Sequence, residues 1–487
     1  MSYYDSSNSF INKLNNLKLR NYNYFETNKK TIDRPREKYN SFVENGNRIL
    51  SKFDGLQNRN TNQNPYMKDK PFFQSQKFSG TDNLLSQGND YYSFNKNSKR
   101  EKTGEDSSNY YFNKNKYNIR NIDDKENKYN IRNIDDKDKN DINNNEYNEI
   151  SEMLNSIISS KIGLRNLGET CYMNVCLQNL IHSKYFIIKL LSKRPIINDR
   201  KTPITKEFLK LCENMLNSST SSVNPENFRY IFCRKHKEFG KYTQFDTIEF
   251  CRYLLDDISN ELNEIKEKTP YRELSTVGKS KMQCFNEFEK LCRSKESSIV
   301  VDSFYGQIIN IFTCTCMHET YSFQTFLDLP ILLPGGTDRI SINNLLSQYF
   351  KKESIIFNEK CEKCRKKKIH DKEIKISNPP RILILSLQRM DERTNRKNNC
   401  EVKFEEKLLI NDYIDDECQD GNKYVYRLYG VGCHSGNINY GHYYAYIKIN
   451  DQDWYEFNDS KVNCIGSNIE TTSKYVYVLF YKRRKIK

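Results

Sequence analysis

Residues 163–180 read GLRNLGETCYMNVCLQNL, and this stretch places a cysteine, Cys171, at the start of an expected helix. From Cys171 to Leu191 the apolar residues recur at helical spacing, as for a helix with one buried face. A helix N-terminus carries about half a positive charge, which favours thiolate over thiol and makes such a cysteine nucleophilic. The alternative interpretation is a buried structural thiol, because free cysteine is among the most buried residue types.

A nucleophilic cysteine needs a histidine to take its proton and a third group to hold the imidazole. Of the six histidines, His442 stands at the start of an expected strand, in the segment YGHYYAY that follows a turn rich in Gly and Asn. Residues 454–459 read WYEFND, a second expected strand that ends in Asn458 and Asp459. Two adjacent antiparallel strands would bring this end beside His442. For a lone histidine in a strand, a structural role is the alternative.

The segment around Cys171 resembles the cysteine box of the ubiquitin-specific proteases, a papain-like family of deubiquitinating enzymes. The segments that hold His442 and Asn458 resemble the histidine box of the same family. The resemblance implies that Cys171 is the nucleophile and His442 the general base. It also implies that Asn166, five positions before the cysteine, helps to bind the oxyanion, that Asn458 orients the imidazole, and that Asp459 supports catalysis.

Residues 244–250 read QFDTIEF and lead into an expected helix over 247–266. Asp246 and Glu249 are three positions apart, so they share one helix face and could bind guanidinium groups. Carboxylates in a first helical turn also complement the helix dipole, which is the alternative. The segment resembles the part of the family that contacts the arginine-rich, Gly-Gly-ending tail of ubiquitin, and this implies a substrate-binding role for both carboxylates.

Two short cysteine motifs predict a metal site. Cys314 and Cys316 form a C-x-C, and Cys361 and Cys364 form a C-x-x-C. Four thiolates from two short loops would hold a tetrahedral structural zinc, and many members of the family carry such a zinc. The first half differs from the usual C-x-x-C, because Thr313 stands where the earlier cysteine would align. A set of free thiols, left by a site that has lost its metal, is therefore the alternative.

The order of the expected elements predicts an α+β fold, with helices first and strands afterwards. The resemblance extends over residues 161–484, which we take as the catalytic domain, and implies a papain-like fold with a helical thumb, a β-rich palm and β fingers. Besides the elements above, helices are expected at 203–216 and 282–293, and strands at 299–301, 307–312, 382–387, 424–431, 443–449 and 475–481.

Residues 1–150 differ in composition from the rest of the chain. They are rich in Asn and Lys, lack Cys and Trp, and carry most of their apolar side chains as isolated Tyr and Phe. Such a stretch cannot bury enough apolar surface to offset its conformational entropy, so we expect a disordered low-complexity region. Apolar residues begin to recur at helical spacing only from Ile150.

The charge and the hydropathy of the chain exclude several classes of function. The net charge of +15 is spread along the sequence, so we expect no dedicated nucleic-acid site. No stretch approaches the roughly 20 apolar residues of a membrane span, and the first residues lack the apolar core of a signal peptide. We therefore expect a location in the cytoplasm or nucleus, where the 15 cysteines serve as free thiols, metal ligands or a nucleophile.

The expected function is that of a thiol-dependent deubiquitinase with no catalytic cofactor. It would hydrolyse the (iso)peptide bond after the C-terminal glycine of ubiquitin through a cysteine acyl-enzyme, and its partners would be ubiquitin and ubiquitinated proteins. A catalytically inactive ubiquitin-binding adaptor and an isopeptidase for another ubiquitin-like modifier are the alternatives. A nucleic-acid-binding module is a further alternative, but the sequence lacks the platform of aromatic and basic residues that would support it.

Overall fold

A computed structural model describes residues 144–486. Gaps in the description fall at residues 242, 268–273, 277, 357–360, 362, 367–368, 392–395, 419–422 and 438–439. Residues 1–143, most of the stretch for which we expected disorder, lie outside the described residues.

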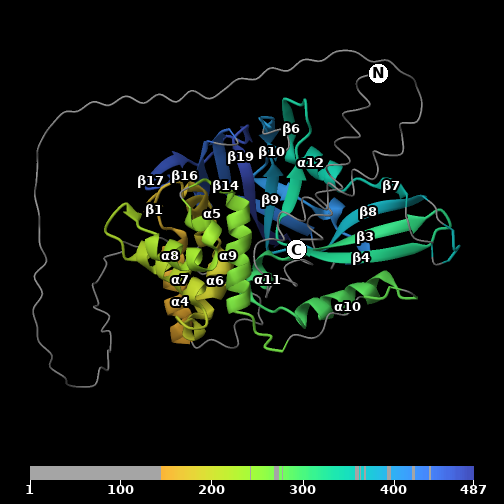
Figure 1. The fold of residues 1–487 in the computed structure, drawn as a ribbon, viewed down its shortest axis with the longest axis horizontal. Helices are drawn as coiled ribbons and strands as arrows, with labels where there is room; N and C mark the ends of the chain where they lie inside the picture. The colour runs from red at the N-terminus through yellow and green to blue at the C-terminus, as the bar shows by residue number, and fades with distance from the viewer. Residues whose placement is uncertain are drawn as a thin grey trace, which may run out of the picture. The chain divides into compact units, whose positions relative to one another are not determined.

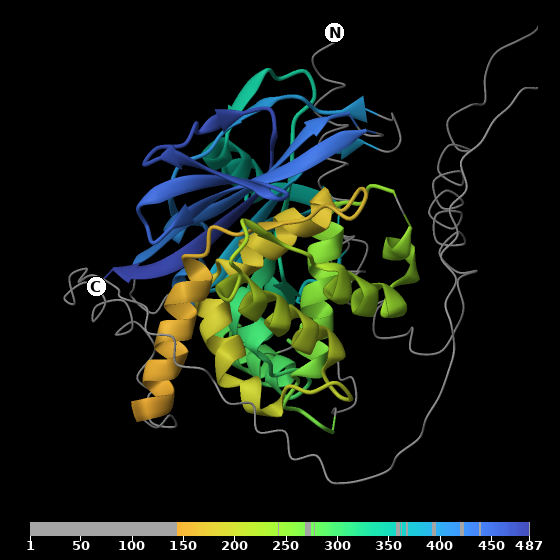
Figure 2. The ribbon, with the colours of Figure 1, turned by 90° about the vertical axis from the view of Figure 1, so that its left-hand side faces the viewer.

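Most of the helices gather into one group beside a large sheet (Figure 1, Figure 2). This group consists of α4 (Asn144–Ile158), α5 (Cys171–Ile181), α6 (Lys184–Ser192), α7 (Pro203–Leu216), α8 (Glu226–Lys235), α9 (Thr247–Glu261) and α11 (Ile299–Phe304). Two further helices, α10 (Lys281–Arg293) and α12 (Ile342–Tyr349), lie outside this group and pack against strands. Short 3₁₀ turns lie at Arg194–Ile196, Lys237–Gly240, Asn411–Tyr413 and Asp416–Cys418. No helix in the described part of the chain is long and apolar enough to cross a membrane.

The large sheet has eight strands in the order β17-β16-β15-β14-β19-β9-β5, with β13 paired to β14 off this path. Its strands are β5 (Leu329–Leu332), β9 (Ile382–Gln388), β13 (Lys407–Leu409), β14 (Lys423–Gly436), β15 (Gly441–Ile449), β16 (Asp453–Asn458), β17 (Lys461–Gly466) and β19 (Val476–Ile486). All pairs are antiparallel except β5 with β9.

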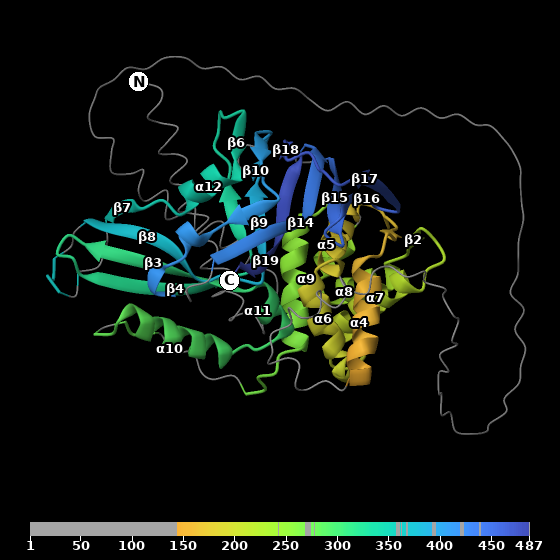
Figure 3. The ribbon, with the colours of Figure 1, turned by 180° about the vertical axis from the view of Figure 1, so that it is seen from behind.

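A second sheet of four strands projects from the side of the large sheet that is away from the group of helices (Figure 1, Figure 3). Its order is β4-β3-β8-β7, from β3 (Gly306–Cys314), β4 (Glu319–Phe326), β7 (Glu353–Ile356) and β8 (Ile369–Asn378). Helix α10 packs against β4 and completes a small core around Cys284 and Phe323. The remaining short strands are β1 (Gly163–Leu164), β2 (Ser222–Val223), β6 (Arg339–Ser341), β10 (Met390–Asp391), β11 (Arg396–Lys397), β12 (Glu401–Lys403) and β18 (Thr472–Ser473).

The large sheet is buried on both faces because helices cover one face and α12 with its neighbouring strands covers the other (Figure 2). Strand β9 shows this alternation: Ile382 and Ile384 belong to the core shared with the helices, whereas Leu383, Leu385 and Leu387 belong to the opposite core. Side chains of a strand point alternately to the two faces, so a strand buried on both reads as a continuous apolar run. The α+β class expected from the sequence is confirmed.

Three boundaries differ from the sequence-based expectation. The single helix expected over residues 171–191 is two helices, because His182 ends α5, with its ring nitrogens 2.8 and 3.0 Å from the carbonyl oxygens of Gln178 and Ser160. Helix α9 ends at Glu261, five residues early, and there the Glu261 carboxylate accepts bonds from two backbone N–H groups at the start of α7. Helix α4 begins at Asn144, six residues before Ile150.

The strand expected at residues 299–301 is wrong, because these residues open the helix α11. The hydroxyl of Ser298 caps this helix by accepting a bond from the N–H of Val301, 3.2 Å away. Ile299 and Val300 are fully buried in the helical core. Burial and the cap together outweigh the preference of β-branched residues for strands.

Candidate active site

Cys171 is the first residue of α5, the helix that lies between the other helices and the sheet (Figure 2). Every residue of α5 is buried, and Cys171 itself is 2% exposed. The chain turns into the helix through Gly168 and Glu169, both at positive φ. The side-chain oxygen of Asn166 accepts bonds from the N–H groups of Gly168 and Thr170, at 3.0 and 3.1 Å, and so holds this turn. The structure thus fixes the sulfur at a helix N-terminus, as the sequence predicts.

His442 faces Cys171 from the second residue of β15. Its Nε2 atom donates a hydrogen bond of 2.8 Å to Oδ1 of Asn458, the last residue of the neighbouring strand β16. The pKa of His442 is raised to about 9, chiefly because the neighbouring Cys171 sulfur stabilises the imidazolium, while partial burial opposes the rise and the bond to Asn458 adds to it. Three side chains expected to act together are therefore brought together, and the imidazole is biased toward its charged form.

Gln244, just before α9, ties the residue preceding His442 to the helical layer. Its side-chain oxygen accepts a bond of 2.9 Å from the N–H of Gly441, and its NH₂ group donates to the Gly441 carbonyl. A Cβ atom at Gly441 would come within 2.1 Å of Nε2 of His434, so only glycine fits there. The sequence segment around Gln244 was singled out for its carboxylates, and this positioning role of the amide was missed.

Lys397 binds the end of β14, the strand that forms a hairpin with β15 and its His442. Its ammonium group donates to Nδ1 of His434 at 2.9 Å and to the carbonyls of His434 and Gly436 at 2.6 and 3.2 Å. Burial, with a smaller effect of nearby Arg389, lowers the pKa of Lys397 to about 8. Burial and the Lys397 charge lower the pKa of His434 to about 3, which keeps this imidazole neutral and able to accept. Sequence reasoning took His434 as structural and did not find Lys397.

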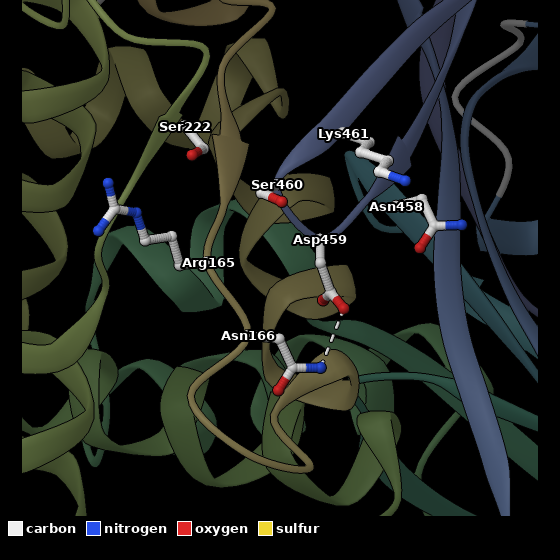
Figure 4. Close-up of a pocket in the computed structure, with 7 residues that line it drawn as sticks. All are labelled: Arg165, Asn166, Ser222, Asn458, Asp459, Ser460 and Lys461. Carbon is white, nitrogen blue, oxygen red and sulfur yellow. Dashed lines mark hydrogen bonds between the residues drawn. The ribbon is translucent and has the colours of Figure 1, made fainter.

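The carboxylate of Asp459 bonds to the helical layer (Figure 4). One oxygen accepts a bond of 2.9 Å from Nδ2 of Asn166, and the other accepts a bond of 2.8 Å from Nδ2 of Asn174. Asp459 therefore joins the residue expected at the oxyanion to α5, whereas Asn458 beside it contacts the imidazole. Asn174 was missed, although a buried amide one turn after Cys171 in an apolar helix is a signal that could have found it.

Asp246 is the N-cap of α9. Its Oδ1 atom accepts bonds from the N–H groups of Ile248 and Glu249, at 2.7 and 3.1 Å, and its other oxygen accepts from the hydroxyl of Tyr477 on β19. The alternative interpretation of Asp246, as a partner of the helix terminus, thus describes part of its role. Glu249 is exposed in the first turn of the same helix.

The four cysteines of the two short motifs lie together at the end of the four-stranded sheet. Their sulfur atoms are all within 4.8 Å of one another, with Cys314 and Cys364 3.9 Å apart and Cys316 and Cys361 3.6 Å apart. Four sulfurs bound to zinc at about 2.3 Å in a tetrahedron would be about 3.8 Å apart, so this donor set fits the ion. The C-x-C half reaches the cluster because Met317, at positive φ, closes a turn in which the Cys314 carbonyl accepts from the Met317 N–H at 2.8 Å.

A cysteine at a helix start, facing a histidine and an asparagine on a sheet, is the arrangement expected of a papain-like cysteine peptidase. The family model described as ubiquitin carboxyl-terminal hydrolase matches residues 162–481. The chain belongs to this family, as the resemblance to ubiquitin-specific proteases implied.

Similar proteins include ubiquitin carboxyl-terminal hydrolase 4 of Saccharomyces cerevisiae, 29% identical over 363 residues that cover 66% of this chain and 39% of that protein. Ubiquitin carboxyl-terminal hydrolase 2 of Bos taurus is 31% identical over 335 residues, covering 66% of this chain and 54% of that protein. The chain thus matches less than two thirds of the length of these curated relatives.

A solved structure of a SAGA DUB module, with Ubp8, Sgf11, Sus1 and Sgf73 bound to monoubiquitin, is similar with a TM-score of 0.54. It is 24% identical and covers 68% of this chain and 71% of that chain. This likeness concerns the fold, and the papain-like architecture expected from the sequence is confirmed.

Proposed function

We propose that this chain is a thiol-dependent deubiquitinase, which hydrolyses the (iso)peptide bond after the C-terminal glycine of ubiquitin. The observation that carries the proposal is the position of His442 between the Cys171 thiol and the Asn458 amide. A thiol peptidase needs this arrangement of nucleophile, base and orienting group. Membership of the ubiquitin carboxyl-terminal hydrolase family supports the choice of ubiquitin as substrate.

The reaction begins when His442 takes the proton of the Cys171 thiol. The thiolate then attacks the carbonyl carbon of the terminal glycine, and a C–S bond forms as the carbonyl oxygen becomes an oxyanion. The imidazolium returns its proton to the departing amine as the C–N bond breaks, which leaves a thioester. Water, activated by His442, hydrolyses the thioester and releases ubiquitin with a free carboxylate.

The oxyanion is stabilised by the amide of Asn166 and by backbone N–H groups at the start of α5. A side-chain NH₂ group has two hydrogens, of which Asp459 accepts one, so the second hydrogen of Asn166 is left for the oxyanion. Asp459 acts in this proposal as a positioning residue, because it contacts Asn166 and not the reacting atoms. Asn458 keeps the imidazole in the tautomer that carries a proton on Nε2.

The arginine-rich tail of ubiquitin would be bound by the first turn of α9. Glu249 is exposed there and can form charge-assisted bonds with a guanidinium group. Asp246 is already bonded as a cap, so its contribution to the same site is mainly its charge.

We further propose that the four-cysteine cluster holds a structural zinc. Four thiolates leave no open position on the metal, so the ion would stabilise the four-stranded sheet and take no part in the chemistry. Elemental analysis of the purified chain should find about one zinc per molecule, and a Cys364→Ser variant should lose it. A metal-free protein that retains its thermal stability would contradict this proposal.

A ubiquitin probe with a thiol-reactive electrophile at its C-terminus tests the proposed activity. We expect one covalent adduct with the native chain and none with Cys171→Ala. Cys464→Ala is the matched control, because Cys464 is an exposed free thiol that any non-specific alkylation would reach, and its adduct should equal that of the native chain. No adduct with the native chain, or an undiminished adduct with Cys171→Ala, would overturn the proposal.

Turnover separates the proposal from its rivals. A native chain that binds ubiquitin but does not hydrolyse ubiquitin–aminomethylcoumarin would be an adaptor. A chain that reacts only with probes built on another ubiquitin-like modifier would be an isopeptidase for that modifier.

A further inference from the structure

A pocket of about 540 Å³ adjoins Asn166, Asn458 and Asp459 (Figure 4). It is lined by Arg165, Asn166, Ser222, Asn458, Asp459, Ser460 and Lys461. Three of these residues belong to the site described above, whereas the outer ones have no role in the mechanism. The pocket therefore shares three residues with the candidate site, and its other four residues are open to a further role.

The walls of the pocket are joined by backbone contacts. The parallel pair of β1 and β2 forms one wall, and the two-residue turn between β16 and β17 forms the other. The N–H of Leu164 donates a bond of 2.9 Å to the carbonyl of Asp459. A Cβ atom at Gly163 would come within 2.6 Å of the carbonyl groups of Asp459 and Ser460, so the two backbones lie in direct contact. The backbones of the two walls are thus held at fixed positions relative to each other.

The sheet order shows which part of a substrate would reach this pocket. His442 is on β15, and the pocket is on β16 and β17, toward one edge of the sheet. Asp246 and the start of α9 contact β19, on the other side of β15, and the four-stranded sheet lies farther in that direction (Figure 1). If the ubiquitin tail is bound by α9, the group on the far side of the scissile bond emerges toward β16 and β17.

Two cations line this exit, one on each wall. Arg165 follows β1 and Lys461 begins β17, and both side chains are exposed. Within the described part of the chain, neither forms an ion pair closer than 4.0 Å. The carboxylate of Asp459 between them is already bonded to Asn166 and Asn174, so its oxygens face amide donors. The pocket thus offers two positive charges that no carboxylate among the described residues pairs.

We propose that this pocket receives the leaving-group side of the substrate, and that Arg165 and Lys461 select conjugates in which Asp or Glu residues flank the ubiquitinated lysine. This inference rests on the proposed deubiquitinase activity and names the substrate class for it. The conjugated lysine passes Asn458 and Asp459 on its way out of the cleft, so its neighbours in the sequence come within reach of both cations. A carboxylate there can bind the Arg165 guanidinium through two parallel hydrogen bonds.

The expected selectivity is modest, because exposed ion pairs are weakened by water and salt. An exposed pair changes an equilibrium constant by less than about fivefold, so two pairs are expected to give a preference of about threefold to tenfold. Screening shortens the range of such charges to about 3 Å near 1 M salt, and the preference should disappear there.

The test measures kcat/KM for ubiquitin joined through an isopeptide bond to fluorescent peptides whose flanking residues are Glu, Ser or Lys. The readout is the ratio of the Glu-flanked to the Lys-flanked value, in which a general loss of activity cancels. We expect a ratio of about three to ten for the full native chain at low salt. The ratio should fall to about one in the Arg165→Gln, Lys461→Gln double variant and fall below one in the Arg165→Glu, Lys461→Glu double variant, which reverses both charges.

Lys201→Gln is the matched control. Lys201 is an exposed lysine just before α7, whose first turn bonds Glu261 at the end of α9 remote from the site. This control should keep the native ratio. A native ratio of one, or a ratio that survives in the double variant or at high salt, would overturn the inference. Hydrolysis of ubiquitin–aminomethylcoumarin by the native chain is measured in parallel, and its absence would instead refute the proposed function.

Discussion

Replacing Asp459 by asparagine keeps the shape of the side chain but exchanges one carboxylate oxygen for an NH₂ group. In the native chain the two oxygens accept bonds from Asn166 and Asn174, at 2.9 and 2.8 Å. An NH₂ group cannot accept, so one of these bonds is lost in Asp459→Asn. Asn174 is buried and Asn166 is exposed, and an unpaired buried donor costs more. We therefore expect the remaining oxygen to stay with Asn174 and Asn166 to lose its support.

The size of the effect follows from the bond that is lost. A hydrogen bond to a charged group contributes about 1.5–3 kcal/mol. If this energy holds Asn166 in place for the oxyanion, kcat should fall by about 10-fold to 150-fold, at about 1.4 kcal/mol per tenfold. Removing the donor itself, in Asn166→Ala, should lower kcat by about 10²–10³-fold, which is the upper bound for Asp459→Asn.

The assay compares kcat and KM for ubiquitin–aminomethylcoumarin in the two single variants and the double variant. Because Asp459 acts through Asn166, the double variant should be no slower than Asn166→Ala. Asp451→Asn is the control, since Asp451 lies at the opposite end of the same β15–β16 hairpin and pairs with Lys482. A kcat of Asp459→Asn within twofold of the native value would refute the reasoning, and so would effects that multiply in the double variant.

Four other changes test neighbouring parts of the structure. The imidazolium of His442 is present below its pKa of about 9 and is lost as the pH rises through that value. Asn458→Ala removes one bond that raises this pKa, so the alkaline limb of the pH profile of kcat/KM should move to lower pH. Lys397→Met removes three bonds that hold the hairpin before His442 and should lower kcat/KM about tenfold in the same assay. Glu169→Asn should raise the free energy of unfolding by about 1 kcal/mol in denaturant titrations, since Asn tolerates the left-handed φ of 56° better than Glu. A chelator that removes zinc should lower the melting temperature of the native chain but leave that of Cys364→Ser unchanged, as measured by differential scanning calorimetry.

The parts of the fold that could be predicted are those in which local pattern and tertiary packing agree. The helix Pro203–Leu216 has its expected bounds, because a proline opens it and one face is apolar throughout. The strand at 382–387 is a run of buried residues that is apolar except for Ser386, and it is covered on both faces. The expected strand at 299–301 failed because three β-branched residues indicate a strand locally, while a serine cap and the helical core decide otherwise.

The same distinction holds for the site. Cys171 and His442 stand in dense local motifs, and a pair of antiparallel strands is enough to place Asn458 beside the imidazole. Gln244, Lys397 and the bond from Asn166 to Asp459 could not be predicted, because each is a contact between segments far apart in the sequence; the last one joins positions 293 apart. A polar residue carries no local sign of the backbone or side chain that it will meet across two layers of the fold.

Histidine titration by NMR tests the contact between sulfur and imidazole more directly than any rate. The chain has six histidines, so ¹³C-histidine labelling, with His442→Gln to assign the resonance, isolates the group of interest. We expect His442 to titrate near pH 9 in the native chain and to move toward its ordinary pKa of 6.5 in Cys171→Ala, where the main cause of the rise is gone. An unchanged pKa of His442 after the thiol is removed would contradict the pairing on which the proposed chemistry depends.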